Sequence, residues 1–191
     1  IRIICENNKI YLSKNNNNFL RINYLTESKN NLILILFRDP EYQSISLKNQ
    51  HLNFSKLQKE NRFILNYMNS LGHYEFGENH KPFFSNEKKI IYNYSDINYW
   101  MSQWIKVYKN LLNEHQKLKK NQNAYFVSYE KLCQSPELFS EKISKFLKKN
   151  INIENLKNNN TLNNQERSKI DKNLLKQSKE IYLRLNEHNF F

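Results

Sequence analysis

An apolar run, Leu32–Leu36, leads directly into the tetrapeptide Phe37–Pro40, which reads Phe-Arg-Asp-Pro. An uninterrupted apolar run of this length predicts a strand that is buried on both faces, as in a parallel sheet. Asp39 is a favourable helix N-cap, and Pro40 suits the first helical position, where its missing N–H is not needed. The segment therefore predicts a strand that passes straight into a helix.

Arg38 would stand at the carboxyl end of this strand, where open α/β sheets bind their ligands. Its guanidinium presents a fork of N–H donors that matches a phosphate group. Ser46 follows eight residues later, two turns into the predicted helix, and adds a hydroxyl donor. The two residues together predict a phosphate site. The alternative is an arginine that pairs with a surface carboxylate, beside an ordinary helix serine.

The remaining patterns predict one more core strand, Ala124–Ser128, and several helices. Helices are expected near residues 19–25, 40–56, 62–71, from 96 onward, after a turn at Pro136, and at 165–186. Residues 72–95 and 149–164 are expected to be loops, and residues 1–5 either a short strand or a helix end. Trp100 and Trp104 are expected in the core. Strands alternating with long helices predict a helix-rich, three-layer α/β sandwich with a parallel sheet, in a single domain spanning residues 1–191.

The composition favours an anionic partner. Lys and Arg number 30 against 18 Asp and Glu, giving a net charge of +12. Such a balance suits a nucleotide, nucleic acid, acidic glycan or membrane surface. Asparagine, lysine and isoleucine are used heavily throughout, a bias typical of AT-rich coding sequence, so the charge alone does not choose among these partners. The 14% aromatic content and the regular apolar spacing argue against disorder.

Cysteine usage and hydropathy indicate a cytoplasmic protein. Cys5 and Cys133 are far apart and lack the spacing of metal ligands, so both are expected to be reduced, buried thiols. No apolar run is long enough for a membrane-spanning helix, and no signal peptide is apparent.

The predicted strand, Arg38-Asp39-Pro40 and Ser46 resemble the 3′-phosphate-binding motif of sulfotransferases that use 3′-phosphoadenosine 5′-phosphosulfate (PAPS). The resemblance extends over residues 10–148. Further matching segments are Leu12–Asn15 followed by Phe19–Ile22, and Val127–Leu132 followed by Ser135–Glu137. The segments Asn49–His51 and Leu71–Gly77 resemble a bacterial subgroup rather than the animal cytosolic enzymes.

The resemblance implies a P-loop-like fold and a residue-by-residue set of roles. Arg38 and Ser46 would bind the 3′-phosphate, Tyr129 the adenine edge, and Lys14 the sulfuryl group or the bridging oxygen. A hydroxyl or amine acceptor would attack sulfur in line, with PAPS as the sulfuryl donor. Lysine and arginine would supply the positive charge, so no metal is expected.

The chain also departs from the family pattern. The glycine-rich phosphosulfate loop has no counterpart, because the only two glycines are Gly72 and Gly77. That loop is expected before Ile1, and residues 1–191 alone are expected to bind PAPS weakly without turnover. Two residues after Lys14, where animal enzymes have a histidine base, stands Asn16. His51, His73, His80 and Glu75 are the candidate bases; a purely structural role in a loop is the alternative for each histidine.

Two other functions are considered. One is a P-loop-type phosphotransferase, which would need a Walker-type loop and a magnesium-binding hydroxyl. The other is a non-catalytic basic module that binds nucleic acid or acidic glycan. The scattered lysines argue against it, because nucleic-acid binders gather basic residues in a stripe with aromatic platforms.

Overall fold

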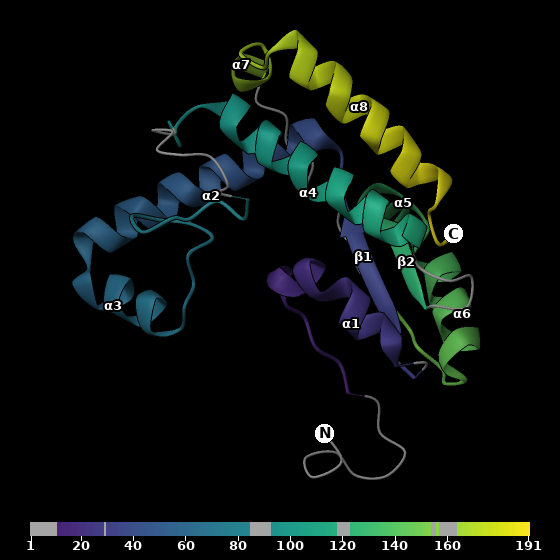
Figure 1. Cartoon of the computed structure of the whole chain (residues 1–191). Helices are drawn as coiled ribbons and strands as arrows, with labels where there is room; N and C mark the ends of the chain where they lie inside the picture. Colours follow the sequence, from purple (N-terminus) through teal and green to yellow (C-terminus); the bar gives the residue numbers. More distant parts are fainter. Residues whose placement is uncertain (1–10, 29, 85–92, 118–122, 154–155, 157–163) are drawn as a thin grey trace.

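A two-stranded parallel sheet lies among long helices (Figure 1). The computed structural model describes residues 11–28, 30–84, 93–117, 123–153, 156 and 164–191. The strands are β1 (Ile33–Phe37) and β2 (Ala124–Ser128), paired in register from Ile33 opposite Ala124 to Phe37 opposite Ser128. Both predicted strands are confirmed. Residues 1–5, with Cys5, lie outside the described residues; Cys133 is a free, half-buried thiol.

The predicted helices are largely confirmed. They are η1 (Asn16–Arg21), α1 (Ile22–Glu27), α2 (Pro40–Glu60), α3 (Arg62–Ser70), α4 (Ile97–Lys117), α5 (Tyr129–Gln134), α6 (Pro136–Leu147), α7 (Asn164–Arg167) and α8 (Lys172–Glu187). In Figure 1, α4 and α8 lie side by side near the sheet, and α2 leads away from the sheet to α3. No helix in the described part of the chain is long and apolar enough to span a membrane.

Two sequence predictions about helices were wrong. The turn expected before Pro136 contains the short helix α5, which begins because the Ser128 side chain accepts a hydrogen bond from the Lys131 amide. The single helix expected at residues 165–186 is interrupted between α7 and α8. The break occurs because Asp171 caps α8, accepting hydrogen bonds from the amides of Asn173 and Leu174.

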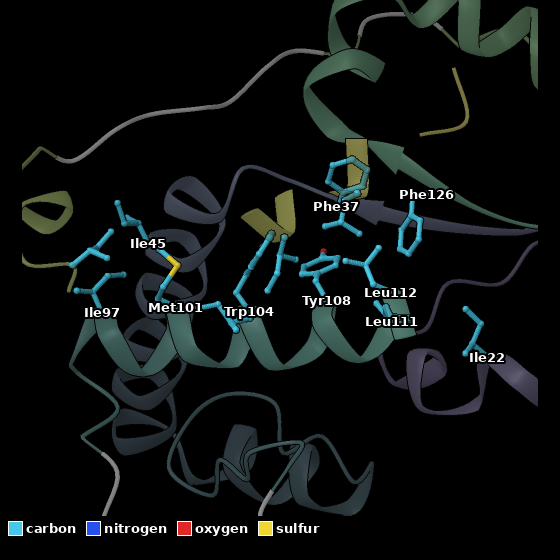
Figure 2. Close-up of a cluster of buried hydrophobic side chains, with 14 of the residues drawn as sticks. Ile22, Phe37, Ile45, Ile97, Met101, Trp104, Tyr108, Leu111, Leu112 and Phe126 are labelled. Carbon is cyan, nitrogen blue, oxygen red and sulfur yellow. The ribbon is translucent and has the colours of Figure 1, made fainter. Parts of the chain in front are cut away.

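One face of α4 forms the centre of the core. Its buried residues are Ile97, Tyr99, Trp100, Met101, Gln103, Trp104, Ile105, Tyr108, Leu111 and Leu112. Figure 2 shows Trp104, Tyr108 and Leu112 on one side of α4, with Phe37 and Phe126 of the sheet near them. Burying each large apolar side chain contributes about 1.5–3 kcal/mol. Trp100 and Trp104 are core residues, as predicted.

The sheet packs against helices on both faces. Ile33, Ile35 and Phe37 belong to the cluster that contains the α4 residues. Leu32 and Leu34 instead pack on a second cluster with Phe139 and Ile143 of α6. Alternate residues of one strand therefore meet different helices. The predicted burial on both faces holds only in part, because Leu36 is 53% exposed.

The short helix α7 is attached to α2 by two ion pairs. Lys48 of α2 pairs with Glu166, and Arg167 pairs with Glu41 at the start of α2. Lys48 and Glu41 are both buried, so each needs its partner. These contacts fix α7 beside the N-terminal half of α2.

Candidate anion site at the carboxyl edge of the sheet

Arg38 lies in the two-residue connection between β1 and α2, at the carboxyl edge of the sheet. Its guanidinium carbon is 5.0 Å from the ring centroid of Tyr129 and 5.9 Å from that of Tyr42. Tyr129 directly follows β2, and Phe37 pairs with Ser128, so parallel pairing brings Arg38 and Tyr129 to the same edge. The structure thus brings together two of the residues predicted from the sequence. Guanidinium-aromatic contacts of this kind orient the donor fork.

The N-terminus of α2 lies beside Arg38. Asp39 is the N-cap: its Oδ1 accepts hydrogen bonds from the amides of Glu41 (2.9 Å) and Tyr42 (3.3 Å). A helix N-terminus carries a partial positive charge that favours anions. Burial raises the pKa of the Asp39 carboxyl, opposed by its two amide hydrogen bonds, while the charges of Glu41 and Glu130 raise it further.

Ser46 is exposed on α2, one turn beyond Tyr42. Residues four apart on a helix share a face, so Ser46 lies on the side of α2 that carries Tyr42. The Arg38 guanidinium packs over the ring of Tyr42, so Ser46 follows this contact by one helical turn. This placement is compatible with a ligand held by both residues. Its role in binding phosphate stays a prediction.

Glu130 connects this edge to the rest of the molecule. Its Oε1 accepts a hydrogen bond from the Asp39 amide at 2.9 Å. Its Oε2 accepts from the hydroxyls of Tyr182 on α8 and Ser128 on β2, each at 3.2 Å. Burial raises the pKa of Tyr182 to about 12, and the nearby charge of Glu130 acts in the same direction.

Lys14 is exposed and lies just before η1. Asn15 caps η1 through the Asn17 amide, and the Asn17 side chain donates to Glu75 at 3.2 Å. Phe19 also packs edge-on against Phe83, with ring centroids 5.0 Å apart. The segment that carries Lys14 therefore leads into a helix that rests on the loop over residues 71–84.

This loop contains three of the four candidate bases, His73, Glu75 and His80. His73 Nδ1 lies 3.4 Å from a carboxylate oxygen of Glu75. Glu75 is thus in contact with both η1, through Asn17, and His73. The structure brings the Lys14 segment and these two candidates into one region. Their catalytic roles stay predictions.

His51 is buried on α2, eleven residues beyond Pro40 and so about 16 Å further along the helix axis. Its Nδ1 accepts a hydrogen bond from the Gly77 amide at 3.2 Å. The rings of His80 and Trp100 lie 5.4 Å and 5.3 Å away. Burial, with the neighbouring His80, lowers the pKa of His51 to about 4. At neutral pH the ring is uncharged and anchors the loop, and its predicted role as a catalytic base has no support in these contacts.

His80 is held on both sides. Its Nδ1 lies 3.1 Å from the carbonyl oxygen of Tyr74, and its Nε2 lies 2.6 Å from the Tyr99 hydroxyl. Because a carbonyl only accepts, Nδ1 carries the proton and Nε2 accepts from Tyr99. Burial lowers the pKa of His80. A surface hollow of about 470 Å³ adjoins this residue, lined by Asn69, Tyr74, Asn79, His80 and Lys81.

Sequence reasoning missed Tyr42 and Tyr182. Tyr42 was detectable in part, because it lies four residues before Ser46 in the predicted helix and so had to share its face. No pattern in the sequence around Tyr182 indicates its contact with Glu130, because that contact forms only when α8 packs on the domain. Glu130 lies within the segment Val127–Leu132, whose sequence indicates no separate role for it.

Within the described residues, no cluster of three or more His, Cys, Asp or Glu side chains could hold a metal ion. Comparison of the chain with protein-family models, curated proteins and solved structures gave no match.

Proposed function

We propose that this chain is a sulfotransferase domain that uses PAPS as sulfuryl donor and holds the donor's 3′-phosphate at Arg38. The observation that carries the proposal is the position of the Arg38 guanidinium. It stands at the carboxyl edge of a parallel strand pair, between the rings of Tyr42 and Tyr129 and next to the N-terminus of α2. A forked donor, a helix N-terminus and a nearby hydroxyl suit a phosphate monoester.

The finer fold assignment is part of the proposal. A three-layer sandwich of the P-loop-like sulfotransferase kind requires helices on both faces of a parallel sheet. Support comes from the sheet residues, which pack alternately on the α4 cluster and on the α6 cluster. A connection from β1 to a parallel neighbour through helices is the arrangement such folds use.

In the proposed reaction, a hydroxyl or amine of the acceptor attacks the sulfur atom. The new oxygen–sulfur or nitrogen–sulfur bond forms as the bond from sulfur to the bridging phosphate oxygen breaks, and adenosine 3′,5′-bisphosphate leaves. The acceptor proton passes to a base. Lys14 would neutralise the charge that develops on the leaving oxygen. Glu75 and His73 are proposed candidates for the base, since they lie beside the η1 helix that follows Lys14.

The test measures how much the 3′-phosphate contributes to nucleotide binding and does not require catalytic turnover. Adenosine 3′,5′-bisphosphate and 5′-AMP differ only in the 3′-phosphate, so the ratio of their dissociation constants, measured by calorimetry, reports what that group contributes to binding. The expected ratio is about tenfold or more in favour of the bisphosphate, from one charge-assisted contact. Arg38→Ala should reduce the ratio to near one.

Arg62→Ala is the matched control. It removes the same charge from an exposed arginine at the start of α3 and should leave the ratio unchanged. Equal binding of the two nucleotides by the unaltered chain would overturn the proposal. An equal loss in both variants would attribute binding to general positive charge instead.

A further inference from the structure

A single carboxylate, that of Glu130, holds the turn that presents Arg38. The Glu130 Oε1 atom accepts a hydrogen bond at 2.9 Å from the Asp39 amide, which belongs to the peptide joining Arg38 to Asp39. The preceding residue, Tyr129, places its ring 5.0 Å from the guanidinium of Arg38. Two consecutive residues of α5 therefore fix the backbone and the side chain of the same arginine.

The other oxygen of Glu130 is anchored from two further elements. It accepts hydrogen bonds from Ser128 at the end of β2 and from Tyr182 of α8. Tyr182 is in turn packed edge-on against Phe37, the last residue of β1, with ring centroids 5.7 Å apart. The carboxylate thus links β2, α8 and the β1–α2 turn, and it has little freedom to move.

A negative charge in this position opposes the binding of an anion. Among the described residues, the groups that donate hydrogen bonds to Glu130 are the Asp39 amide and the hydroxyls of Ser128 and Tyr182, and these three donors are uncharged. By charge alone, Glu130 would weaken a phosphate site next to Arg38. Its geometric effect and its electrostatic effect on phosphate binding therefore have opposite signs, which makes them separable by experiment.

We propose that Glu130 is a positioning residue of the anion site: it holds the Arg38–Asp39 peptide so that the guanidinium lies between Tyr42 and Tyr129 and can select a 3′-phosphate. This inference rests on the proposed function. In this proposal Glu130 does not contact the phosphate. It positions Arg38, and through Arg38 it sets the selectivity for the bisphosphate over the monophosphate.

The test compares Glu130→Gln with Glu130→Ala, which remove the same charge. The glutamine amide oxygen can still accept from the Asp39 amide, whereas alanine leaves that N–H without its partner. Calorimetry with adenosine 3′,5′-bisphosphate and 5′-AMP, well below the unfolding temperature, gives the selectivity ratio of each variant. Glu130→Gln should keep the ratio or raise it, and Glu130→Ala should lower it about tenfold.

Glu130→Asp covers the case in which the alanine variant does not fold. It keeps the charge but is one methylene shorter, so it cannot reach the Asp39 amide and Tyr182 together. We expect its selectivity ratio to fall by about threefold or more while that of Glu130→Gln does not. The reverse order, or a shared gain in bisphosphate affinity in all variants that lose the charge, would overturn the inference.

Two outcomes separate the failure of this inference from that of the proposed function. If the unaltered chain does not prefer the bisphosphate, the proposed function fails. If it does, but Glu130→Ala and Glu130→Asp lower only the unfolding temperature and keep the ratio, Glu130 is merely structural and only the inference fails.

Discussion

At the scale of single residues, polar side chains hold loop and turn backbone in place by accepting hydrogen bonds from amides, as His51 does for Gly77 and Glu130 does for Asp39. His51 shows this most clearly, because it is 6% exposed and its Nδ1 accepts the amide hydrogen of Gly77. Protonation of Nδ1 would remove that acceptor and place a charge among aromatic rings. Burial among these rings disfavours the charged form, which lowers the pKa of His51 to about 4.

We expect His51 to make stability depend on pH. Its pKa is near 6.5 in an unfolded chain and about 4 in the folded one, so between these values the unfolded state binds more protons. The free energy of unfolding should therefore fall as pH decreases from about 6.5 to about 4, by at most about 3 kcal/mol from this residue. Denaturant unfolding at a series of pH values measures it.

His51→Gln keeps an acceptor for Gly77 and cannot titrate, so its unfolding free energy should change less over this pH window. His188→Gln, at an exposed position after α8, is the control. Because the charge of His188 is a smaller cause than burial of the lowered pKa of His115, this variant should stay closer to the unaltered chain than His51→Gln does. An identical pH dependence in all three proteins would show that His51 does not resist protonation.

The residues of the candidate site and of the adjoining loop differ in how far their positions could be predicted from sequence. Arg38 and Tyr129 each follow a core strand, and parallel pairing makes such positions neighbours, so their meeting was predictable. The environment of His51 was not, since it depends on a distant glycine whose loop has no periodic pattern. Placement of a side chain within a long loop requires the tertiary contacts themselves.

At the scale of elements, the loop over residues 71–84 is fastened to α2 at Gly77. That residue has φ +89°, and a Cβ atom there would lie 2.2 Å from Gln58 Oε1. The same Gln58 oxygen accepts the Glu78 amide at 2.7 Å. The close approach of backbone to a buried glutamine explains why glycine is needed at this position.

We expect Gly77→Ala to destabilise the protein more than Gly72→Ala. Both glycines have positive φ, so alanine introduces backbone strain of about 1 kcal/mol at either position. At Gly72 a Cβ atom meets open space, whereas at Gly77 it displaces Gln58. Gly77→Ala should therefore lower the free energy of unfolding by about 2–3 kcal/mol in total. Chemical denaturation of both variants provides the measurement, and equal losses would contradict the crowding at Gly77.

Elements with long, regular patterns were predictable, and short ones were not. The face of α4 repeats over its full length, and the strand β1 is marked by the apolar run and the Asp-Pro cap. By contrast, α5 has six residues, too few for periodicity to show. The break before α8 depends on Asp171 acting as a cap in a segment that otherwise resembles continuous helix.

At the scale of the whole molecule, a net charge of +12 means that an anion could bind in two ways, at a specific site or to the positively charged surface in general. Several cations are already paired: Lys48 with Glu166, Arg167 with Glu41, and Lys145 with Glu141. A site built from a fixed guanidinium discriminates between ligands by short-range geometry. A diffuse positive surface discriminates only by ligand charge.

Salt therefore distinguishes the proposed site from a general basic module. Raising NaCl from about 50 mM to about 300 mM should weaken binding of single-stranded RNA by orders of magnitude, because counterion release dominates it. Affinity for adenosine 3′,5′-bisphosphate should fall by a smaller factor, and its ratio to 5′-AMP should persist, since the Arg38 contact is short-range. Arg38→Ala should remove the ratio at every salt concentration and leave RNA binding almost unchanged. If RNA binds more tightly than the bisphosphate at physiological salt and Arg38→Ala has no selective effect, the charge of the whole surface, rather than the carboxyl edge of the sheet, defines the function.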